Sequence, residues 1–177
     1  MTSVTEQIAE WVEGATYSSI PQVGIDRVKE RVIDSLGVMF AGMAVDTGQI
    51  ISEWVRDIGA REDSSVVASD LKTTAAFATL LNATAGHALE YDDTSVFSGH
   101  YANPVTAAAL AVGESVGASG ADVVLAWMTG YEVIAAVAKA TNTPKGNSLL
   151  INGFFNQGFY PVFGVAALAG KLMGLDA

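Results

Sequence analysis

Residues 25–43 read Ile25-Asp26-Arg27-Val28-Lys29-Glu30-Arg31-Val32-Ile33-Asp34-Ser35-Leu36-Gly37-Val38-Met39-Phe40-Ala41-Gly42-Met43. The apolar residues in this stretch recur at intervals of three and four, which is the spacing of one face of an α-helix. The members of the stripe are Val28, Val32, Ile33, Leu36, Met39, Phe40 and Met43. Four charged residues, from Arg27 to Arg31, face away from it. The pattern predicts an amphipathic helix that packs this stripe against other helices.

Six further segments have helical character, and only the stretch 65–69 favours a short strand. The first is a short helix containing Ile8, Trp11 and Val12, and the others span about 47–58, 73–90, 104–115, 123–140 and 159–173. The stretch 141–155 is rich in Asn, Gly, Pro and Thr, so it is predicted to be a loop. The sequence therefore predicts an all-α fold, a multi-helix bundle formed by one domain over residues 1–177.

Start and stop signals support these assignments. Pro104 suits the first turn of a helix, and Ser119-Gly120-Ala121-Asp122 has the form of a capping box before the helix at 123–140. That helix is apolar on nearly every face, which predicts that it is buried on all sides at the centre of the core. Gly174 suits a helix C-cap, and Asp176 suits the N-cap of another helix. We therefore expect the chain to stop between two helices.

Composition excludes several functional classes. The 177 residues include no cysteine, which excludes disulfides, thiolate zinc sites and cysteine nucleophiles. Nine basic against nineteen acidic side chains give a net charge of -10, which argues against a nucleic-acid partner. The longest uncharged run, 146–170, is interrupted by polar residues, and the N-terminus lacks the regions of a signal peptide. These features predict a cytoplasmic protein with no membrane partner.

The densest polar cluster reads His87-Ala88-Leu89-Glu90-Tyr91-Asp92-Asp93-Thr94 and is followed by His100. Crowded carboxylates at the end of an apolar helix can have raised pKa values, which suits general acid or base catalysis near neutral pH. Helical spacing also places His87 beside Glu90, so a histidine–carboxylate pair is expected. Two alternatives remain open. The carboxylates can form a solvated helix end that caps the next turn, an interpretation that periodicity alone favours. A divalent metal site ranks last, because the cluster lacks a diagnostic ligand motif.

The segment from His87 to Thr94 resembles the His-Ala-Leu-Asp-Phe-Asp-Asp-Thr motif of the MmgE/PrpD family of dehydratases and decarboxylases. Four more stretches match the family in order, at 100–111, 117–120, 130–133 and 163–176. The resemblance covers nearly the whole chain. It implies the first portion of an all-helical domain, without the smaller α+β lid of the family.

The resemblance also implies roles for individual residues. Glu90 stands at the family's first motif aspartate and His100 at its motif histidine, so both are expected to be catalytic, with Asp93 orienting the site. His87, Tyr101, Asn156 and Gln157 are expected to contact the substrate. Neither metal nor organic cofactor is implied. Two departures stand out: Tyr101-Ala102 replaces Pro-Ser, and Phe155 falls where the family has a second active-site histidine.

Two hypotheses for the function follow. The first is a subunit of a split lyase or isomerase, which acts on a small carboxylic acid by dehydration, decarboxylation or isomerisation. A carboxylate substrate needs cationic partners, yet no Lys or Arg occurs between Lys72 and Lys139. A second polypeptide is therefore expected to carry the lid and the basic residues, in a dimer or hetero-oligomer. The second hypothesis is a non-catalytic helical partner that stabilises or regulates another chain, which Phe155 favours.

Overall fold

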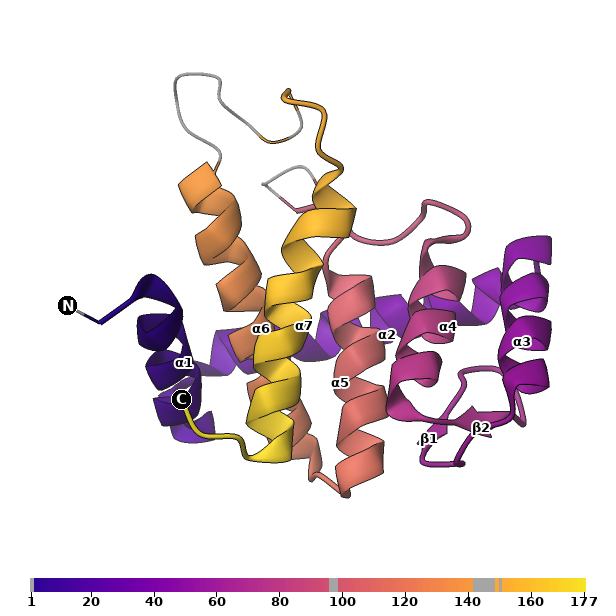
Figure 1. Cartoon of the computed structure of the whole chain (residues 1–177), viewed down its shortest axis with the longest axis horizontal. Helices are drawn as coiled ribbons and strands as arrows, with labels where there is room; N and C mark the ends of the chain where they lie inside the picture. Colours follow the sequence, from indigo (N-terminus) through magenta and orange to yellow (C-terminus); the bar gives the residue numbers. More distant parts are fainter. Residues whose placement is uncertain (1, 96–98, 142–148, 150) are drawn as a thin grey trace.

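The structure is a computed structural model that describes residues 2–95, 99–141, 149 and 151–177 (Figure 1). These residues form seven α-helices: α1 Val4–Gly14, α2 Gln22–Gly42, α3 Asp46–Ile58, α4 Ala75–His87, α5 Ala102–Val116, α6 Gly120–Thr141 and α7 Asn156–Met173. A 3₁₀ turn, Tyr17–Ser19, precedes α2, and a two-stranded antiparallel hairpin of β1 Ser64–Ser65 and β2 Lys72–Thr73 separates α3 from α4. The prediction of a mostly helical fold is confirmed.

The predicted signals at the start of α6 and at the end of α7 have the expected geometry. The Asp122 backbone N–H lies 3.2 Å from Ser119 Oγ, and the Ser119 backbone N–H lies 3.1 Å from the Asp122 carboxylate, so the capping box is formed. Gly174 ends α7 with a φ of 66°, a left-handed conformation that glycine adopts without strain. Of the predicted loop, residues 151–155 are not helical, and residues 142–148 and 150 lie outside the described part of the chain.

Helices α4, α5, α6 and α7 stand side by side, and α2 runs across them (Figure 1). Helix α5 lies at the centre of the bundle, so nine of its fifteen residues are buried. Most of these are alanines, whose small side chains let helices approach from several sides. The main core cluster comprises Val28, Tyr101, Ala102, Val105, Ala108, Ala109, Ala126, Trp127, Ile134, Ala138, Tyr160 and Leu168.

The prediction that the helix at 123–140 is buried on all sides was wrong. Glu132, Ala136 and Lys139 fall on one face of α6, and all three are exposed, because charged side chains stay hydrated. Helix α6 is long and apolar enough to cross a bilayer by length and composition alone. Its buried residues pack in the core of this bundle.

The apolar stripe predicted for α2 also needs correction, since Ile33 and Phe40 are exposed. The buried face instead includes Ser35 and Gly42. A Cβ at Gly42 would overlap the carbonyl oxygen of Ala85 in α4, so the two helices cross at backbone contact distance. Small residues occupy the contact line because the crossing is this close, and the bulkier side chains remain outside it.

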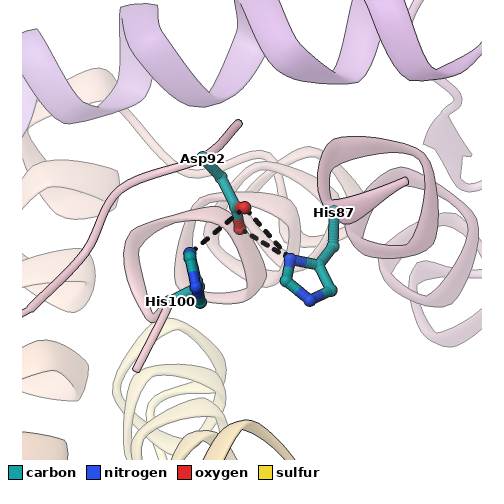
Figure 2. A group of neighbouring side chains, drawn as sticks. All are labelled: His87, Asp92 and His100. Carbon is teal, nitrogen blue, oxygen red and sulfur yellow. Dashed lines mark hydrogen bonds and ion pairs between the residues drawn. The ribbon is translucent and has the colours of Figure 1, made fainter. Parts of the chain in front are cut away.

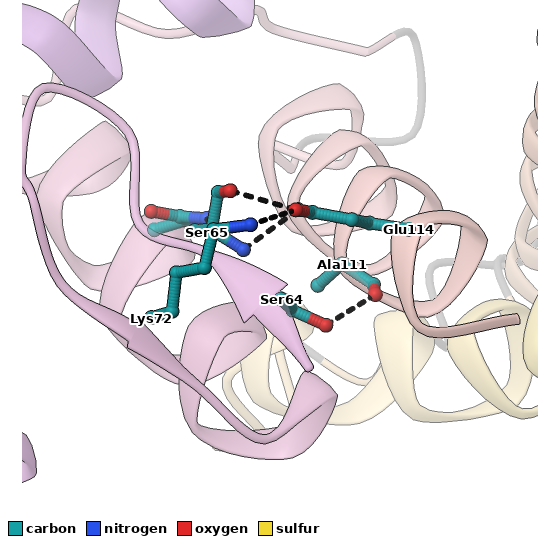
Figure 3. A network of polar contacts seen from close by, with 6 residues as sticks. Ser64, Ser65, Lys72, Ala111 and Glu114 are labelled. Atoms are coloured by element: carbon teal, nitrogen blue, oxygen red, sulfur yellow. Dashed lines mark hydrogen bonds and ion pairs between the residues drawn. The ribbon is translucent and has the colours of Figure 1, made fainter. Parts of the chain in front are cut away.

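Strand β1 is shorter than the predicted stretch 65–69, because Ala68 has a φ of 57° and turns the chain back. Polar contacts fix the hairpin to α5 (Figure 3). Ser64 Oγ donates to the Ala111 carbonyl at 2.7 Å, and Ser65 donates to the Glu114 carboxylate through its backbone N–H at 2.7 Å and its hydroxyl at 2.8 Å. Lys72 Nζ lies 3.0 Å from the same carboxylate. The segment between α3 and α4 is thereby tied to the central helix.

Helices α6 and α7 also pack at backbone distance, and this contact gives a testable prediction. A Cβ at Gly164 would lie 2.5 Å from the Gly130 carbonyl oxygen and 2.5 Å from the Ile134 side chain. Gly164→Ala should therefore lower the free energy of unfolding by about 1–3 kcal/mol, the usual scale for overpacking. Urea denaturation followed by circular dichroism measures the change.

The matched control lies on the same helix. At Gly170 the nearest atom to an added Cβ is 4.0 Å away, so Gly170→Ala should raise the free energy of unfolding by about 0.5–1 kcal/mol through helix propensity. Equal effects of the two substitutions would show that the α6–α7 contact is not tight.

Candidate functional site

The candidate site is formed by the connection between α4 and α5, which holds the polar cluster noted in the sequence. Helix α4 ends at His87 rather than at the predicted Glu90, because Glu90 adopts a left-handed φ of 48°. The chain then returns to α5, where the Asp93 carboxylate accepts a hydrogen bond from the Ala102 backbone N–H at 2.8 Å. Ala102 is the first residue of α5, so Asp93 caps that helix and fixes one end of the connection.

Three side chains meet inside this connection, as Figure 2 shows. The His87 Nδ1 atom lies 3.0 Å from Oδ1 and 3.2 Å from Oδ2 of Asp92. The His100 Nδ1 atom lies 3.3 Å from the same Asp92 Oδ1. The two imidazole rings are 5.1 Å apart between centroids. The Asp92 side chain is only 2 % exposed, against 33 % for His87 and 23 % for His100, so a buried carboxylate supports two partly accessible histidines.

These histidines line a cleft of about 520 Å³. Its walls come from the start of α3, from α4, from the connection, from the start of α5 and from the start of α7. The lining residues are Thr47, Leu80, Ala83, Thr84, His87, Ala88, Glu90, Asp92, His100, Asn103, Pro104, Phe155, Gln157 and Gly158. Four residues expected from the sequence are therefore brought together: His87, Glu90, His100 and Gln157. Phe155, the departure from the family pattern, lines the same cleft.

Two of the expected substrate contacts lie elsewhere. Tyr101 is fully buried, and its ring meets Tyr160 edge-on with centroids 5.9 Å apart. Burial raises the pKa of its hydroxyl far above the ordinary value. Asn156 is 1 % exposed. Both residues start helices, Tyr101 as the N-cap of α5 and Asn156 in the first turn of α7, and their side chains pack inward behind the cleft.

Asp93 is also absent from the cleft wall, and its burial has an electrostatic consequence. Burial raises the pKa of this carboxyl, and the negative charge of Asp92 adds to the shift. The hydrogen bond from Ala102 and the charges of Arg31 and His100 oppose it, but they do not outweigh burial. Asp93 thus lies behind the cleft wall, and its burial disfavours the ionised form of its carboxyl group.

A pH-dependent stability difference follows from this shift. A carboxyl whose pKa is raised in the folded state contributes stability below its unfolded pKa of about 3.9, and that contribution is lost as the pH rises through the folded value. Because asparagine stays neutral, Asp93→Asn should be more stable than the wild type at pH 7. The difference should shrink as the pH falls towards 4.

Urea denaturation of both proteins at several pH values measures this difference. Asp34→Asn, a change at an exposed position of α2, is the control and should alter stability little at any of them. A less stable Asp93→Asn protein at pH 7 would mean that the charged hydrogen bond to Ala102 outweighs burial.

The sequence alone did not single out Asp92. It was one of three neighbouring carboxylates, and its position five residues after His87 belongs to no helical contact pattern. The sequence signal for Asp92 was its place in the motif that runs from His87 to Thr94. Which of the two neighbouring aspartates faces the histidines depends on how the chain turns back after Glu90.

The described residues that line the cleft include no Lys or Arg, whereas they include the carboxylates Glu90 and Asp92. An imidazole whose Nδ1–H is held by a carboxylate presents Nε2 for proton transfer. The arrangement can therefore move protons, but within the described residues it offers no fixed cation for an anionic ligand.

Comparison with known proteins shows which family the chain resembles. The family model described as the MmgE/PrpD N-terminal domain matches residues 6–177. Cis-aconitate decarboxylase of Homo sapiens is 27% identical over 186 residues, covering 100% of this chain and 37% of that protein. The Mus musculus enzyme is 26% identical, covering 99% and 36%, and one from Aspergillus terreus is 27% identical, covering 98% and 36%. The chain thus spans little more than a third of the length of these relatives.

Proposed function

The chain belongs to the MmgE/PrpD family, and on that premise we propose that it is a subunit of a lyase or isomerase that acts on a small carboxylic acid. The observation that carries this proposal is the buried Asp92 carboxylate shared by two histidines on a cleft wall. Such a group transfers protons without a metal or organic cofactor. The cis-aconitate decarboxylases among its relatives support a reaction next to a carboxylate.

In the proposed mechanism, His87 and His100 are the groups that move protons. Asp92 accepts the Nδ1–H of His87, so the Nε2 lone pair is left for a substrate proton. The same Asp92 oxygen lies 3.3 Å from Nδ1 of His100, so the carboxylate stabilises either ring when it becomes positively charged. Glu90, exposed at the edge of the cleft, is the second acid or base.

Each of the three reaction classes requires proton transfer at or next to a substrate carbon. In dehydration, one group removes a proton from carbon and another protonates the leaving hydroxyl. In isomerisation, a proton leaves one position and returns to another. In decarboxylation, carbon dioxide leaves and the resulting carbanion receives a proton. Dehydration and isomerisation therefore need a proton acceptor and a proton donor at neighbouring positions of the substrate, and decarboxylation needs a proton donor beside the carbanion.

A second polypeptide completes the site in this proposal. A substrate carboxylate that leaves water requires Lys or Arg partners, and the described cleft lining contains neither. Ile151, Phe154 and Phe155 are exposed apolar residues just before α7, and Phe155 lines the cleft itself. A partner that covers these side chains and brings cations would exclude water from the proton-transfer groups.

Purification of the native complex through a tag on this chain tests the proposal. The complex is expected to convert a small carboxylic acid, and the co-purified polypeptide is expected to carry the basic residues. The alternative is a non-catalytic partner subunit, which Phe155 at the family's histidine position favours, and it predicts a different result. If it holds, a complex built with Asp92→Asn keeps full activity, whereas the proposed mechanism requires a loss.

A further inference from the structure

We propose that His87, Asp92 and His100 also form an inhibitory binding site for one divalent transition-metal ion of the zinc class. One ligand atom from each residue lies within 4.8 Å of the other two. The three side chains point towards one another, His87 from the end of α4 and Asp92 and His100 from the connection that precedes α5 (Figure 2). Binding itself does not depend on the proposed enzymatic function, whereas the inhibition rests on it.

The spacing of the ligand atoms supports coordination. Zinc bonds to imidazole nitrogen and carboxylate oxygen are about 2.0–2.1 Å long, so neighbouring ligand atoms in a tetrahedral site are about 3.3 Å apart. Asp92 Oδ1 lies 3.0 Å from Nδ1 of His87 and 3.3 Å from Nδ1 of His100. Two edges of the tetrahedron are therefore close to their required lengths. The third edge joins the two imidazole nitrogens. It requires the two rings to turn towards each other, and the partly exposed His87 has room to do so.

An unsatisfied atom is the second observation. The Nδ1 atom of His100 is buried and makes no hydrogen bond within the described part of the structure, although it faces the Asp92 carboxylate. Buried polar atoms usually have a partner, and a metal ion would supply one to this lone pair. The Asp92 carboxylate is 2 % exposed, so the anionic ligand is already held in place.

Charge and ligand type decide the class of ion. Glu90 and Asp92 make the cleft anionic, and the cleft lining that the structure describes has no Lys or Arg to compete with a cation. Two imidazoles and one carboxylate favour zinc, copper(II) or nickel over magnesium and calcium, which prefer all-oxygen sites. A zinc ion held by three such ligands takes water or another ligand in its fourth position.

Occupation of this site conflicts with proton transfer. A metal on Nδ1 of His87 replaces the proton that Asp92 accepts there and leaves the ring proton on Nε2, so the Nε2 lone pair that the proposed mechanism uses is lost. The metal also occupies the Asp92 oxygen. Added zinc should therefore inhibit the assembled enzyme, and exhaustive chelation should leave its activity intact or raise it. Inhibition is a consequence that ordinary surface binding of zinc would not produce.

Isothermal titration of the purified chain with zinc chloride, after removal of metals by a chelator, tests the site. We expect one zinc ion per chain and at least tenfold weaker affinity in His87→Ala and in Asp92→Asn. Glu132→Gln, an exposed position on α6 outside the cleft, is the control and should bind as the wild type does. Magnesium should not bind under the same conditions.

Circular dichroism of each variant establishes that a loss of binding is not a loss of folding, and cobalt(II) provides a second readout. A tetrahedral site of this kind should give an intense visible cobalt spectrum that Asp92→Asn abolishes without any change in helix content. Absence of zinc binding by the wild type, or equal binding by the cleft variants and the control, would overturn the site. Zinc binding that leaves turnover of the complex unchanged would overturn its inhibitory role.

Discussion

His100→Ala in the assembled enzyme is expected to lower kcat by about 10²- to 10⁴-fold, the usual scale for removal of a general acid or base. The imidazole of His100 lines the cleft, and its Nδ1 atom lies 3.3 Å from the buried Asp92 carboxylate. Alanine removes the proton-transfer group, while the walls that hold the substrate remain. We therefore expect a large fall in kcat with little change in KM, measured by steady-state kinetics of the purified complex.

Tyr91→Phe is the matched control for this measurement. Tyr91 belongs to the same connection, but its side chain is almost entirely exposed and does not line the cleft. Its substitution should leave kcat unchanged. Normal turnover by the His100→Ala complex would make His100 a structural residue, and the interpretation of the cluster as a solvated helix end would then be favoured.

The isolated chain is expected to be inactive. The purified chain is expected to show no measurable turnover of small carboxylic acids, and co-expression with its partner is expected to produce activity. The physical reason is charge: the chain carries a net charge of -10, and the described residues of the cleft offer carboxylates but no Lys or Arg. An anionic substrate would be repelled from this site until basic groups reach it.

Comparison of the chain alone, the partner alone and the co-expressed complex in one assay measures this requirement. Size-exclusion chromatography of the same samples shows whether activity follows the complex. An isolated monomer of this chain that converts a carboxylic acid unaided would refute the need for a second polypeptide.

The sequence predicted the helices well because their signals are local. Spacing of apolar residues, the Ser119–Asp122 capping box and the glycine at position 174 each act within a few residues, and the structure has all three. The buried face of α2 was predicted less well. Whether Ile33 or Ser35 meets the core depends on how closely α4 crosses α2, and a backbone contact at Gly42 is a tertiary feature that periodicity does not contain.

The candidate site was predicted as a cluster but not in its internal arrangement. The end of α4 depends on the left-handed backbone of Glu90, a conformation for which a glutamate gives no local signal. Beyond that point helical spacing no longer applies. The sequence therefore could not show that Asp92 lies between the histidines while Asp93 turns away to cap α5.

Solvent isotope exchange tests proton transfer in this cleft most directly. The purified complex is incubated in D₂O with a panel of small carboxylic acids, and deuterium incorporation and product masses are followed by mass spectrometry. We expect that one acid gains deuterium at carbon, or gives a product that carries it, with the wild-type complex and not with the His100→Ala complex. Equal incorporation by both complexes, or none with any acid in the panel, would contradict it.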